Sequence, residues 1–497
     1  MFRKILVANR GEIAVRVIRA LREMEIRSVA IFSEADRAAL PVQMADEAFC
    51  VGPPASSESY LAGSRILDAA RATGAQAIHP GYGFLSENAA FAKACDEAGI
   101  KFIGPPWQAI EQMGSKTAAR RLAIKACAPV VPGTEQGLRD HEEARQTAAL
   151  IGYPVLLKAA AGGGGKGMRR VDSEAQLEPA MRDAANEAER AFGSGEMYLE
   201  KVIDRPRHIE VQILGDEHGH LIHLGERECS IQRRHQKVVE ESPSPLVLRK
   251  PELREMIGEA ALRIARAANY SNAGTLEFLA DQHGNFYFLE MNTRLQVEHP
   301  VTEWVTGVDL VCWQIRIAAG EPLQIKQSDV RWRGSAIECR VYAEDPDNNF
   351  FPTPGRIARY VEPSGPGVRI DSGVYEGWTV PIEYDPLLSK LSVWGETRES
   401  AIQRMRRAVG EYRIIGMTTN LGLFKKLMAD DRFLIGDLHT AFLDEFMGRS
   451  RTRETDQGEL LASILAAAHT GTGKSQVIPE TPSPGAWRIE GRRGLLR

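Results

Sequence analysis

The chain has 497 residues, of which 62 are basic and 66 acidic, so its formal net charge is −4. This length predicts about three domains, and 43% hydrophobic with 26% charged residues is typical of a folded globular protein rather than a disordered one. The balanced charge argues against a nucleic-acid partner, and no stretch is apolar and long enough to cross a membrane. Six scattered cysteines without a CxxC pair predict free thiols and a cytoplasmic location.

The first 110 residues alternate short apolar runs with amphipathic runs. Strands are predicted at 5–8, 28–32, 77–79 and 101–103, and a helix at 12–24. Such alternation predicts a parallel sheet with helices on both faces. The turn after the first strand, Asn9–Glu12, has a single glycine, whereas a dinucleotide-binding fingerprint needs three. A nicotinamide or flavin site is therefore not expected here.

Residues 154–171 place five glycines and two lysines between two strand-like runs. Glycines allow several backbone N–H groups to converge on an anion, and lysines add positive charge. The segment predicts a hairpin flap over nucleotide phosphates; the alternative is a flexible hairpin tip without a ligand. A second glycine–lysine segment, 471–475, ends like a phosphate-binding loop, but Ala468 replaces the required glycine, which favours a linker.

Residues 274–292 are typical of a β-hairpin that turns near His283-Gly284. A two-residue turn there pairs Gln282 with Asn285 and, counted back along both strands, Glu277 with Glu290. Like charges directly opposite each other destabilise a sheet unless something neutralises them. A divalent cation with oxygen ligands, Mg²⁺ or Mn²⁺ shared with nucleotide phosphates, would do so. The alternative is that one carboxyl is protonated or paired with an arginine.

The same segment continues with polar residues at every second position, namely Glu290, Asn292, Arg294, Gln296 and Glu298. If the chain stays extended, these five side chains share one face. Their order suits an oxyanion held by Arg294 and Gln296, with Glu298 as the base. A solvated edge strand would show the same alternation.

Two further segments are less specific. On its charges alone, 226–241 (ERECSIQRRHQKVVEE) is expected to be a solvated strand pair. Segment 79–88 (HPGYGFLSEN) is a glycine-bracketed loop after a strand, and such loops often build sites at the edge of parallel sheets.

Six segments together resemble the biotin carboxylase family of the ATP-grasp superfamily, over about residues 1–447. They are 8–14 (ANRGEIA), 79–88, the glycine-rich loop 158–167, 226–241, 290–303 (EMNTRLQVEHPVTE) and 339–346 (CRVYAEDP). The resemblance implies a fold that is part α/β and part α+β. Its parts would be a Rossmann-like N-terminal domain at 1–113, an ATP-grasp domain at 114–330 with a mobile glycine-rich lid at about 131–205, a biotin carboxylase C-terminal domain at 331–447 and a tail at 448–497.

The resemblance also implies roles for individual residues. ATP phosphates would be held by Lys116, Lys158, Gly162, Gly163, Gly164, Gly165 and Gly167, and the nucleoside by Glu200, Lys201, Ile203, His208, Gln232 and His235. The metal ligands would be Glu277, Glu290 and Asn292. Bicarbonate would be held by Lys237, Arg294, Gln296 and the Val297 backbone and deprotonated by Glu298, while Tyr82 and Arg340 would face biotin. Arg340 would stabilise the biotin enolate, and Arg16 and Asp385 match positions at or near a dimer contact.

The activity implied by the resemblance is carboxylation of biotin by bicarbonate and ATP through carboxyphosphate, the first half-reaction of a multi-subunit acyl-CoA carboxylase. The chain contains no Ala-Met-Lys-Met biotinylation segment, so biotin is expected on a separate carrier protein or domain. The other expected partners are a second copy of the chain and a carboxyltransferase subunit. The tail is expected to dock a partner; the alternative is a disordered end.

Three other functions are weighed against this one. They are the biotin carboxylase subunit of a pyruvate carboxylase, an ATP-grasp ligase that activates another carboxylate, and a non-catalytic ATP-binding scaffold. The ligase would not account for Arg294, Gln296 and Glu298 together with Tyr82 and Arg340, and the scaffold predicts the loss of a catalytic residue, which is not seen.

Overall fold

The computed structural model describes residues 1–134, 137–138, 140–159 and 168–449. The chain divides into two units, 1–444 and 445–497, and the fold below is that of the first. The loop glycines at 162–167, the 471–475 segment and nearly all of the predicted tail lie outside the described residues. In the described part of the chain, no helix is long and apolar enough to cross a membrane.

The N-terminal part is the predicted parallel sheet, with spatial order β3-β2-β1-β4-β5. Its strands are β1 (Lys4–Val7), β2 (Arg27–Ser33), β3 (Glu47–Gly52), β4 (Ala77–His79) and β5 (Lys101–Phe102). The helices of this part are α1 (Gly11–Glu23), α2 (Leu40–Met44), α3 (Gly63–Thr73), α4 (Ala89–Glu97) and α5 (Trp107–Gly114). The predicted strands and first helix are confirmed to within a residue at their ends.

The strand β1 shows why this sheet is covered on both faces. Ile5 and Val7 pack with α1 and with α12 (Leu310–Ala318), whereas Leu6 and Ala8 pack with α3 and α4. Because successive side chains of a strand point to opposite faces, an unbroken apolar strand needs helices on both sides. The Rossmann-like expectation is met.

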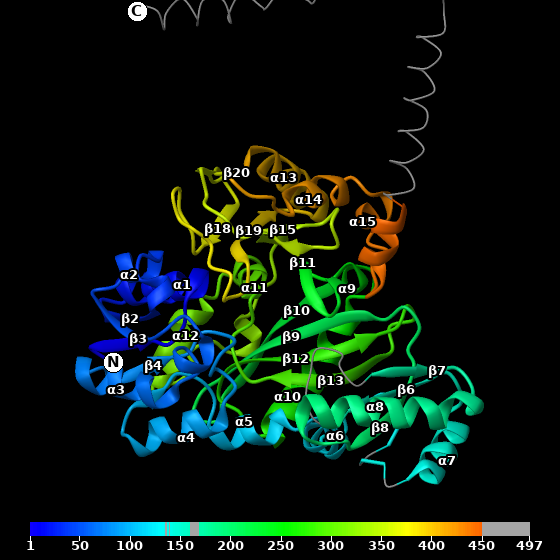
Figure 1. Ribbon diagram of the computed structural model, residues 1–497. Helices are drawn as coiled ribbons and strands as arrows, with labels where there is room; N and C mark the ends of the chain where they lie inside the picture. Colours follow the sequence, from blue (N-terminus) through cyan, green and yellow to red (C-terminus); the bar gives the residue numbers. More distant parts are fainter. Residues whose placement is uncertain (135–136, 139, 160–167, 450–497) are drawn as a thin grey trace, which may run out of the picture. The chain divides into compact units, whose positions relative to one another are not determined.

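A second, three-stranded antiparallel sheet has the order β7-β6-β8. It consists of β6 (Val155–Ala159), β7 (Arg169–Val171) and β8 (Met197–Lys201), with α7 (His141–Ile151) and α8 (Leu177–Phe192) beside it (Figure 1). Val155 pairs with Val171, so the predicted hairpin around the glycine-rich segment is confirmed at its base. The helix α6 (Lys116–Lys125) precedes this part of the chain.

The largest sheet has eight strands in the order β13-β12-β9-β10-β11-β14-β19-β18, all neighbours antiparallel. The strands are β9 (Arg207–Gly215), β10 (Leu221–Arg233), β11 (Gln236–Ser242), β12 (Asn272–Ala280), β13 (Phe286–Asn292), β14 (Ser335–Tyr342), β18 (Val368–Ser372) and β19 (Leu387–Gly395). β11 pairs with β14, so this sheet crosses the predicted border at residue 330. The predicted ATP-grasp and C-terminal domains are therefore joined by one hydrogen-bonded sheet.

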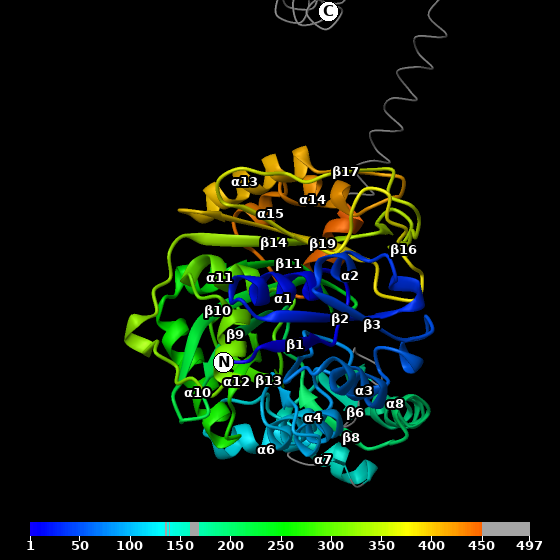
Figure 2. The same cartoon turned by 90° about the vertical axis from the view of Figure 1, so that its left-hand side faces the viewer.

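Helices and two short strand pairs complete this unit (Figures 1 and 2). The helices are α9 (Pro245–Arg249), α10 (Glu252–Ala267), α11 (His299–Thr306), α13 (Arg398–Glu411), α14 (Leu421–Leu427) and α15 (Asp431–Leu434). The strand pairs are β15 (Glu344–Asp345) with β16 (Phe351–Pro352) and β17 (Arg359–Val361) with β20 (Arg413–Ile415). The start of α1 packs against β18 and β19, which brings the N-terminal part onto the far end of the large sheet.

Candidate active site

A cavity of about 1230 Å³ is lined by residues from all three predicted domains. The predicted site residues on its wall are Tyr82, Lys116, Lys158, Glu200, Lys201, Ile203, His208, Gln232, His235, Lys237, Glu277, Glu290, Asn292, Arg294, Gln296, Val297 and Arg340. Glu298 is fully buried and contacts two of these wall residues, Lys237 and Arg340. The structure thus brings together all the predicted site residues that it describes.

Glu277 lies directly opposite Glu290 in the β12–β13 hairpin, as predicted. The predicted turn is wrong by one residue, however. Gln282 does not pair with Asn285; instead the Asp281 N–H donates to the Asn285 carbonyl, which makes a longer loop. The correct pairing at the carboxylates therefore needs a second irregularity between the loop and Glu277.

That irregularity is a register shift that leaves Leu289 without a partner. Phe278 pairs with Phe288, and Glu277 with Glu290, so the strand β13 carries one extra residue between the two pairs. In a regular strand, residues 288 and 290 would point to the same face; a β-bulge sends them to opposite faces. Phe288 consequently lies in the apolar core, while Glu290 faces the cavity.

Glu277 is held by four side chains. Its Oε1 atom lies 2.9 Å from Lys237 Nζ and accepts hydrogen bonds from Asn292 Nδ2 at 2.8 Å and Gln296 Nε2 at 3.1 Å. His208 Nε2 lies 2.9 Å from Oε2. Burial by itself would raise the pKa of Glu277, but Lys237 and His208 outweigh it and hold the pKa well below the usual range. Glu277 is thus a fixed carboxylate.

Glu290 differs from its cross-strand neighbour. Its carboxylate has no hydrogen bond or ion pair with any residue that the structure describes, and burial together with the charge of Glu277 raises its pKa. Two adjacent carboxylates facing a cavity, one of them without a partner, offer the oxygen ligands that Mg²⁺ and Mn²⁺ prefer. The donor set therefore fits a divalent cation. The predicted third ligand, Asn292, already accepts a hydrogen bond from Arg294 Nη2 at 3.0 Å through its Oδ1.

Lys237 connects three carboxylates. Its Nζ lies 2.5 Å from Glu210 Oε2, 2.9 Å from Glu277 Oε1 and 2.7 Å from Glu298 Oε1. Burial would lower the pKa of Lys237, but the three carboxylates raise it well above the usual range. The side chain is therefore a positive charge at the centre of the site.

The predicted extended run from 290 to 298 is wrong beyond Asn292, where β13 ends. The chain bends at Arg294 and turns at 297–298, because α11 begins at His299. Arg294 still faces the cavity: its Nη1 donates to Gln296 Oε1 at 2.8 Å, and its Nε donates to Glu87 Oε2 at 2.8 Å. Glu87 belongs to the 79–88 loop, so this N-terminal loop helps to orient the guanidinium.

The turn places Glu298 between two cations. Its Oε1 lies 2.7 Å from Lys237 Nζ, and its Oε2 accepts a hydrogen bond from Arg340 Nη2 at 2.8 Å. Burial would raise the pKa of Glu298, but Lys237 and Arg340 hold it well below the usual range. Glu298 is thus ionised and able to accept a proton. Arg340 also donates to Glu240 Oε1 at 2.6 Å, and burial raises the pKa of Glu240 to about 7 despite that contact.

The other end of the cavity carries the predicted nucleotide residues. Lys158 Nζ lies 2.5 Å from Glu200 Oε2, and Arg120 Nη1 donates to Glu200 Oε1 at 3.0 Å. Lys116 begins α6, and burial lowers the pKa of its ammonium group. His235 forms the β10–β11 turn with a positive φ of 66°. The wall here is cationic around a buried carboxylate and suits an anionic ligand.

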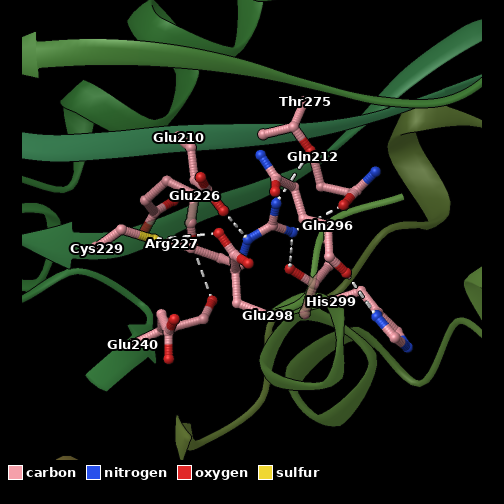
Figure 3. Close-up of polar contacts among 12 residues, drawn as sticks. Glu210, Gln212, Glu226, Arg227, Cys229, Glu240, Thr275, Gln296, Glu298 and His299 are labelled. Carbon is pink, nitrogen blue, oxygen red and sulfur yellow. Dashed lines mark hydrogen bonds and ion pairs between the residues drawn. The ribbon is translucent and has the colours of Figure 1, made fainter. Parts of the chain in front are cut away.

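The expectation that 226–241 is a solvated strand pair is wrong. Figure 3 shows Arg227 enclosed by polar side chains, and it is completely buried. Its Nε donates to Glu210, its Nη1 to Gln212 Oε1 at 2.8 Å and its Nη2 to Thr275 Oγ1 at 3.0 Å. The charges are paired inside the protein, which is the condition for burying them.

Glu210 and Arg227 were not predicted from the sequence. Glu210 pairs with Lys237, and Arg227 pairs with Glu210. The signal was available in β9, where His208, Glu210 and Gln212 alternate with three branched apolar residues. That alternation gives the same face to all three polar side chains. Arg16, expected at a subunit contact, pairs within the chain with Glu303 at 3.0 Å, and Asp385 lines the cavity. Their contact with a second copy stays a prediction.

Comparison with known proteins settles the family. Three family models match the chain in order: the biotin carboxylase N-terminal domain at 1–110, the ATP-binding domain of the carbamoyl-phosphate synthase L chain at 115–326 and the biotin carboxylase C-terminal domain at 338–445. The chain belongs to the biotin carboxylase family. Its three-domain fold and its class, an ATP-dependent ligase, are those of this family.

Individual biotin carboxylase relatives cover most of the chain. It is 54% identical to the biotin carboxylase of a Nostoc species over 89% of this chain and 99% of that one. It is 55% identical to a pyruvate carboxylase subunit of Methanothermobacter thermautotrophicus over 90% of each chain. Among solved structures, the biotin carboxylase domain dimer of Hydrogenobacter thermophilus 2-oxoglutarate carboxylase, in complex with MgADP, ADP and bicarbonate, matches with a TM-score of 0.85 and 51% identity, over 90% of this chain and 98% of that one.

Proposed function

We propose that the protein uses ATP and bicarbonate to carboxylate biotin that a carrier outside these 497 residues presents. The observation that supports this most is the convergence of Lys237, Glu277, Arg294, Glu298 and Arg340 in one cavity. A fixed carboxylate and an ionised base, both in contact with Lys237, and two guanidinium groups in the same cavity are what bicarbonate activation requires.

The proposed chemistry divides the cavity into two regions. Lys116 and Lys158 bind the ATP phosphates, and Glu200, Lys201, Ile203, His208, Gln232 and His235 surround the nucleoside. In phosphoryl transfer the protein mainly positions the reacting groups and neutralises the negative charge of the phosphates. A phosphate entering beside Lys158 competes with Glu200 for its ammonium group. A divalent cation held by Glu277 and Glu290 supplies further neutralisation of the phosphates when it is bound.

In the second region, Arg294, Gln296, Lys237 and the Val297 backbone hold bicarbonate, and Glu298 takes its proton. Bicarbonate attacks the γ-phosphorus of ATP, ADP leaves, and carboxyphosphate forms. Carboxyphosphate breaks into CO₂ and phosphate, and phosphate removes the N–H proton of biotin. Arg340 stabilises the negative charge on the ureido oxygen, and the biotin nitrogen attacks CO₂ beside Tyr82.

Free biotin is expected to stimulate bicarbonate-dependent ATP cleavage by the purified full chain. The stimulation follows because ATP cleavage and biotin carboxylation share one cavity. The assay measures ADP release with and without biotin, and with and without bicarbonate. Cleavage that ignores biotin would contradict the proposal, and ATP binding without any cleavage would favour the scaffold.

We propose three partners and a location. A second copy of the chain is expected, so light scattering should give a mass of about twice 54.8 kDa. The others are the carrier and a carboxyltransferase subunit of an acyl-CoA carboxylase; the alternative is the carboxyltransferase of a pyruvate carboxylase. We also propose a cytoplasmic location, in keeping with the free thiols of all six cysteines.

Removing residues 448–497 is expected to weaken capture of the biotinylated carrier while leaving activity on free biotin unchanged, because the cavity lies in the first unit. The measurement is a pull-down with the purified chain as bait, detected with avidin. Capture that is undiminished by the truncation contradicts a docking role for the tail. The proposed domain borders at 113/114, 330/331 and 447/448 stay predictions.

A further inference from the structure

The 79–88 loop that carries Tyr82 is held in place by the turn before α1. Asn9 donates both N–H bonds of its side-chain amide, to the Pro80 carbonyl at 2.6 Å and to the Tyr82 carbonyl at 2.7 Å. Gly81 between them has a positive φ of 63°, and a Cβ there would lie 2.9 Å from Asn9 Nδ2. The two hydrogen bonds and the close approach at Gly81 therefore fix the position of the loop backbone relative to Asn9.

The Tyr82 side chain is fixed by the same turn. Its hydroxyl donates to Glu12 Oε1. Burial, and then the negative charge of Glu12, raise the pKa of Tyr82 well above the usual range, so the phenol keeps its proton. Glu12 is 3% exposed, and a buried carboxylate needs a cation nearby.

Lys390 of β19 is that cation. It is 1% exposed, its Nζ lies 3.3 Å from Glu12 Oε1 and 3.8 Å from Asp371 Oδ2, and it lies 5.9 Å from the centre of the Tyr82 ring. Asp371 is in turn paired with Arg369 at 2.8 Å. The ammonium group is thus shared by two carboxylates, those of Glu12 and Asp371.

The same ammonium group also reaches the other side of the cavity. Lys390 Nζ donates to the Val297 carbonyl at 2.8 Å. Val297 lies between Gln296 and Glu298, in the irregular segment that replaces the predicted strand. One buried lysine therefore joins two cavity segments that are more than 200 residues apart in sequence.

We propose that Asn9, Glu12 and Lys390 are positioning residues that fix Tyr82 relative to the 293–298 segment, and so set the distance between biotin and the bicarbonate site. The inference rests on the proposed function. Among the described residues, none of the three forms a hydrogen bond or ion pair with the predicted nucleotide residues Lys116, Lys158 and Glu200. Among the described side chains, Glu12 forms a hydrogen bond or ion pair only with Tyr82 and Lys390, so these two residues account for the burial of its carboxylate.

The test uses Lys390→Met, Glu12→Met and the double variant in the full chain. Each single variant is expected to raise KM for free biotin by at least about tenfold, in the range known for small misplacements of reacting groups, with KM for ATP within about twofold of the unmodified protein. Removing one member of a buried ion pair also lowers stability, whereas removing both restores it in part. The melting temperature of the double variant should therefore lie above that of Lys390→Met, while its KM for biotin stays raised.

Arg254→Met is the matched control, because it removes a salt bridge to Glu226, 2.8 Å long, outside the cavity. It should lower stability without a selective change in KM for biotin. Equal changes in both KM values, or a KM for biotin that recovers with stability in the double variant, would overturn the proposal.

Amide hydrogen exchange keeps this test separate from the proposed function. Lys390→Met should speed exchange in peptides covering 79–88 and 293–298, but not in α6. Unchanged exchange in both peptides would overturn the positioning role whether or not the protein is active. An unmodified protein that ignores biotin would contradict the proposed function instead.

Discussion

Replacing Glu298 with glutamine is expected to abolish biotin-dependent ATP cleavage while leaving nucleotide binding nearly intact. The carboxylate is buried and ionised between Lys237 and Arg340, so it is poised to take a proton from bicarbonate. Loss of a general base lowers rates by about 10²–10⁴-fold. Steady-state ADP release measures the rate, and fluorescence titration with a nucleotide analogue measures binding.

Glu240→Gln is the matched control for that variant. Glu240 also pairs with Arg340, but it does not contact Lys237. Because burial raises the pKa of Glu240 to about 7, glutamine resembles a protonated form that is already populated at neutral pH. The rate loss should be below about tenfold near pH 7, less than for loss of the base, and should grow as pH rises. A loss of ATP affinity in Glu298→Gln equal to its loss of rate would contradict the role as base.

Replacing Glu290 with glutamine is expected to raise the stability of the metal-free protein and to lower its activity by about 10²-fold at fixed Mg²⁺. Stability rises because two carboxylates face each other across β12 and β13, an arrangement that costs about 0.2–1 kcal/mol. Activity falls because a ligand for the cation is lost. Thermal melts in EDTA and activity titrated against Mg²⁺ measure the two effects.

The pH dependence of stability provides a second readout. The pKa of Glu290 is raised in the folded state, so above the ordinary glutamate pKa the folded protein binds more protons than the unfolded one. Stability in EDTA should therefore fall as pH rises from the ordinary glutamate pKa to the raised pKa of Glu290. Glu290→Gln should make this fall shallower, and the rest of it comes from other buried carboxyls with raised pKa values, such as Glu240.

Glu277→Gln should behave differently, losing both stability and activity, because Glu277 balances Lys237 and His208. If Glu290→Gln melts at a lower temperature than the unmodified protein in EDTA, the like-charge interpretation is wrong.

Local pattern was enough to predict most of the N-terminal sheet and the hairpin under the glycine-rich segment. The Glu277–Glu290 pair was predicted correctly from a turn that is wrong by one residue, because the bulge at Leu289 restores the register. These features depend on periodicity and on contacts between neighbours in the chain. The bulge at Leu289 and the end of β13 at Asn292 were not predicted. The even positions change there from apolar Phe286 and Phe288 to polar Glu290 and Asn292, and this change was the sign of the bulge.

The remaining omissions involve contacts between distant segments. Arg227 meets Thr275, and Lys390 meets both Glu12 and Val297, through folding of the whole first unit. Residue spacing along the sequence does not predict contacts between segments that are this far apart. The charged residues of 226–241 and the polar residues of β9 were the available signs of these contacts, and those of 226–241 were wrongly attributed to solvent exposure.

The pairing of β11 with β14 has a mechanical consequence. Glu277 and Glu290 on β12 and β13 and Arg340 on β14 belong to one hydrogen-bonded sheet, whereas Lys158 belongs to the separate sheet β7-β6-β8. A hinge between the cation ligands and Arg340 would have to break strand pairing, so the span between these groups is rigid. Within the described residues, the sheet that carries Lys158 shares no strand with the large sheet. The two sheets are joined through the segment 130–133, where Val130 bridges to Phe288 of β13 and Gly133 bridges to Glu200 of β8. A displacement of Lys158 would therefore need no change in the strand pairing that joins the cation ligands to Arg340.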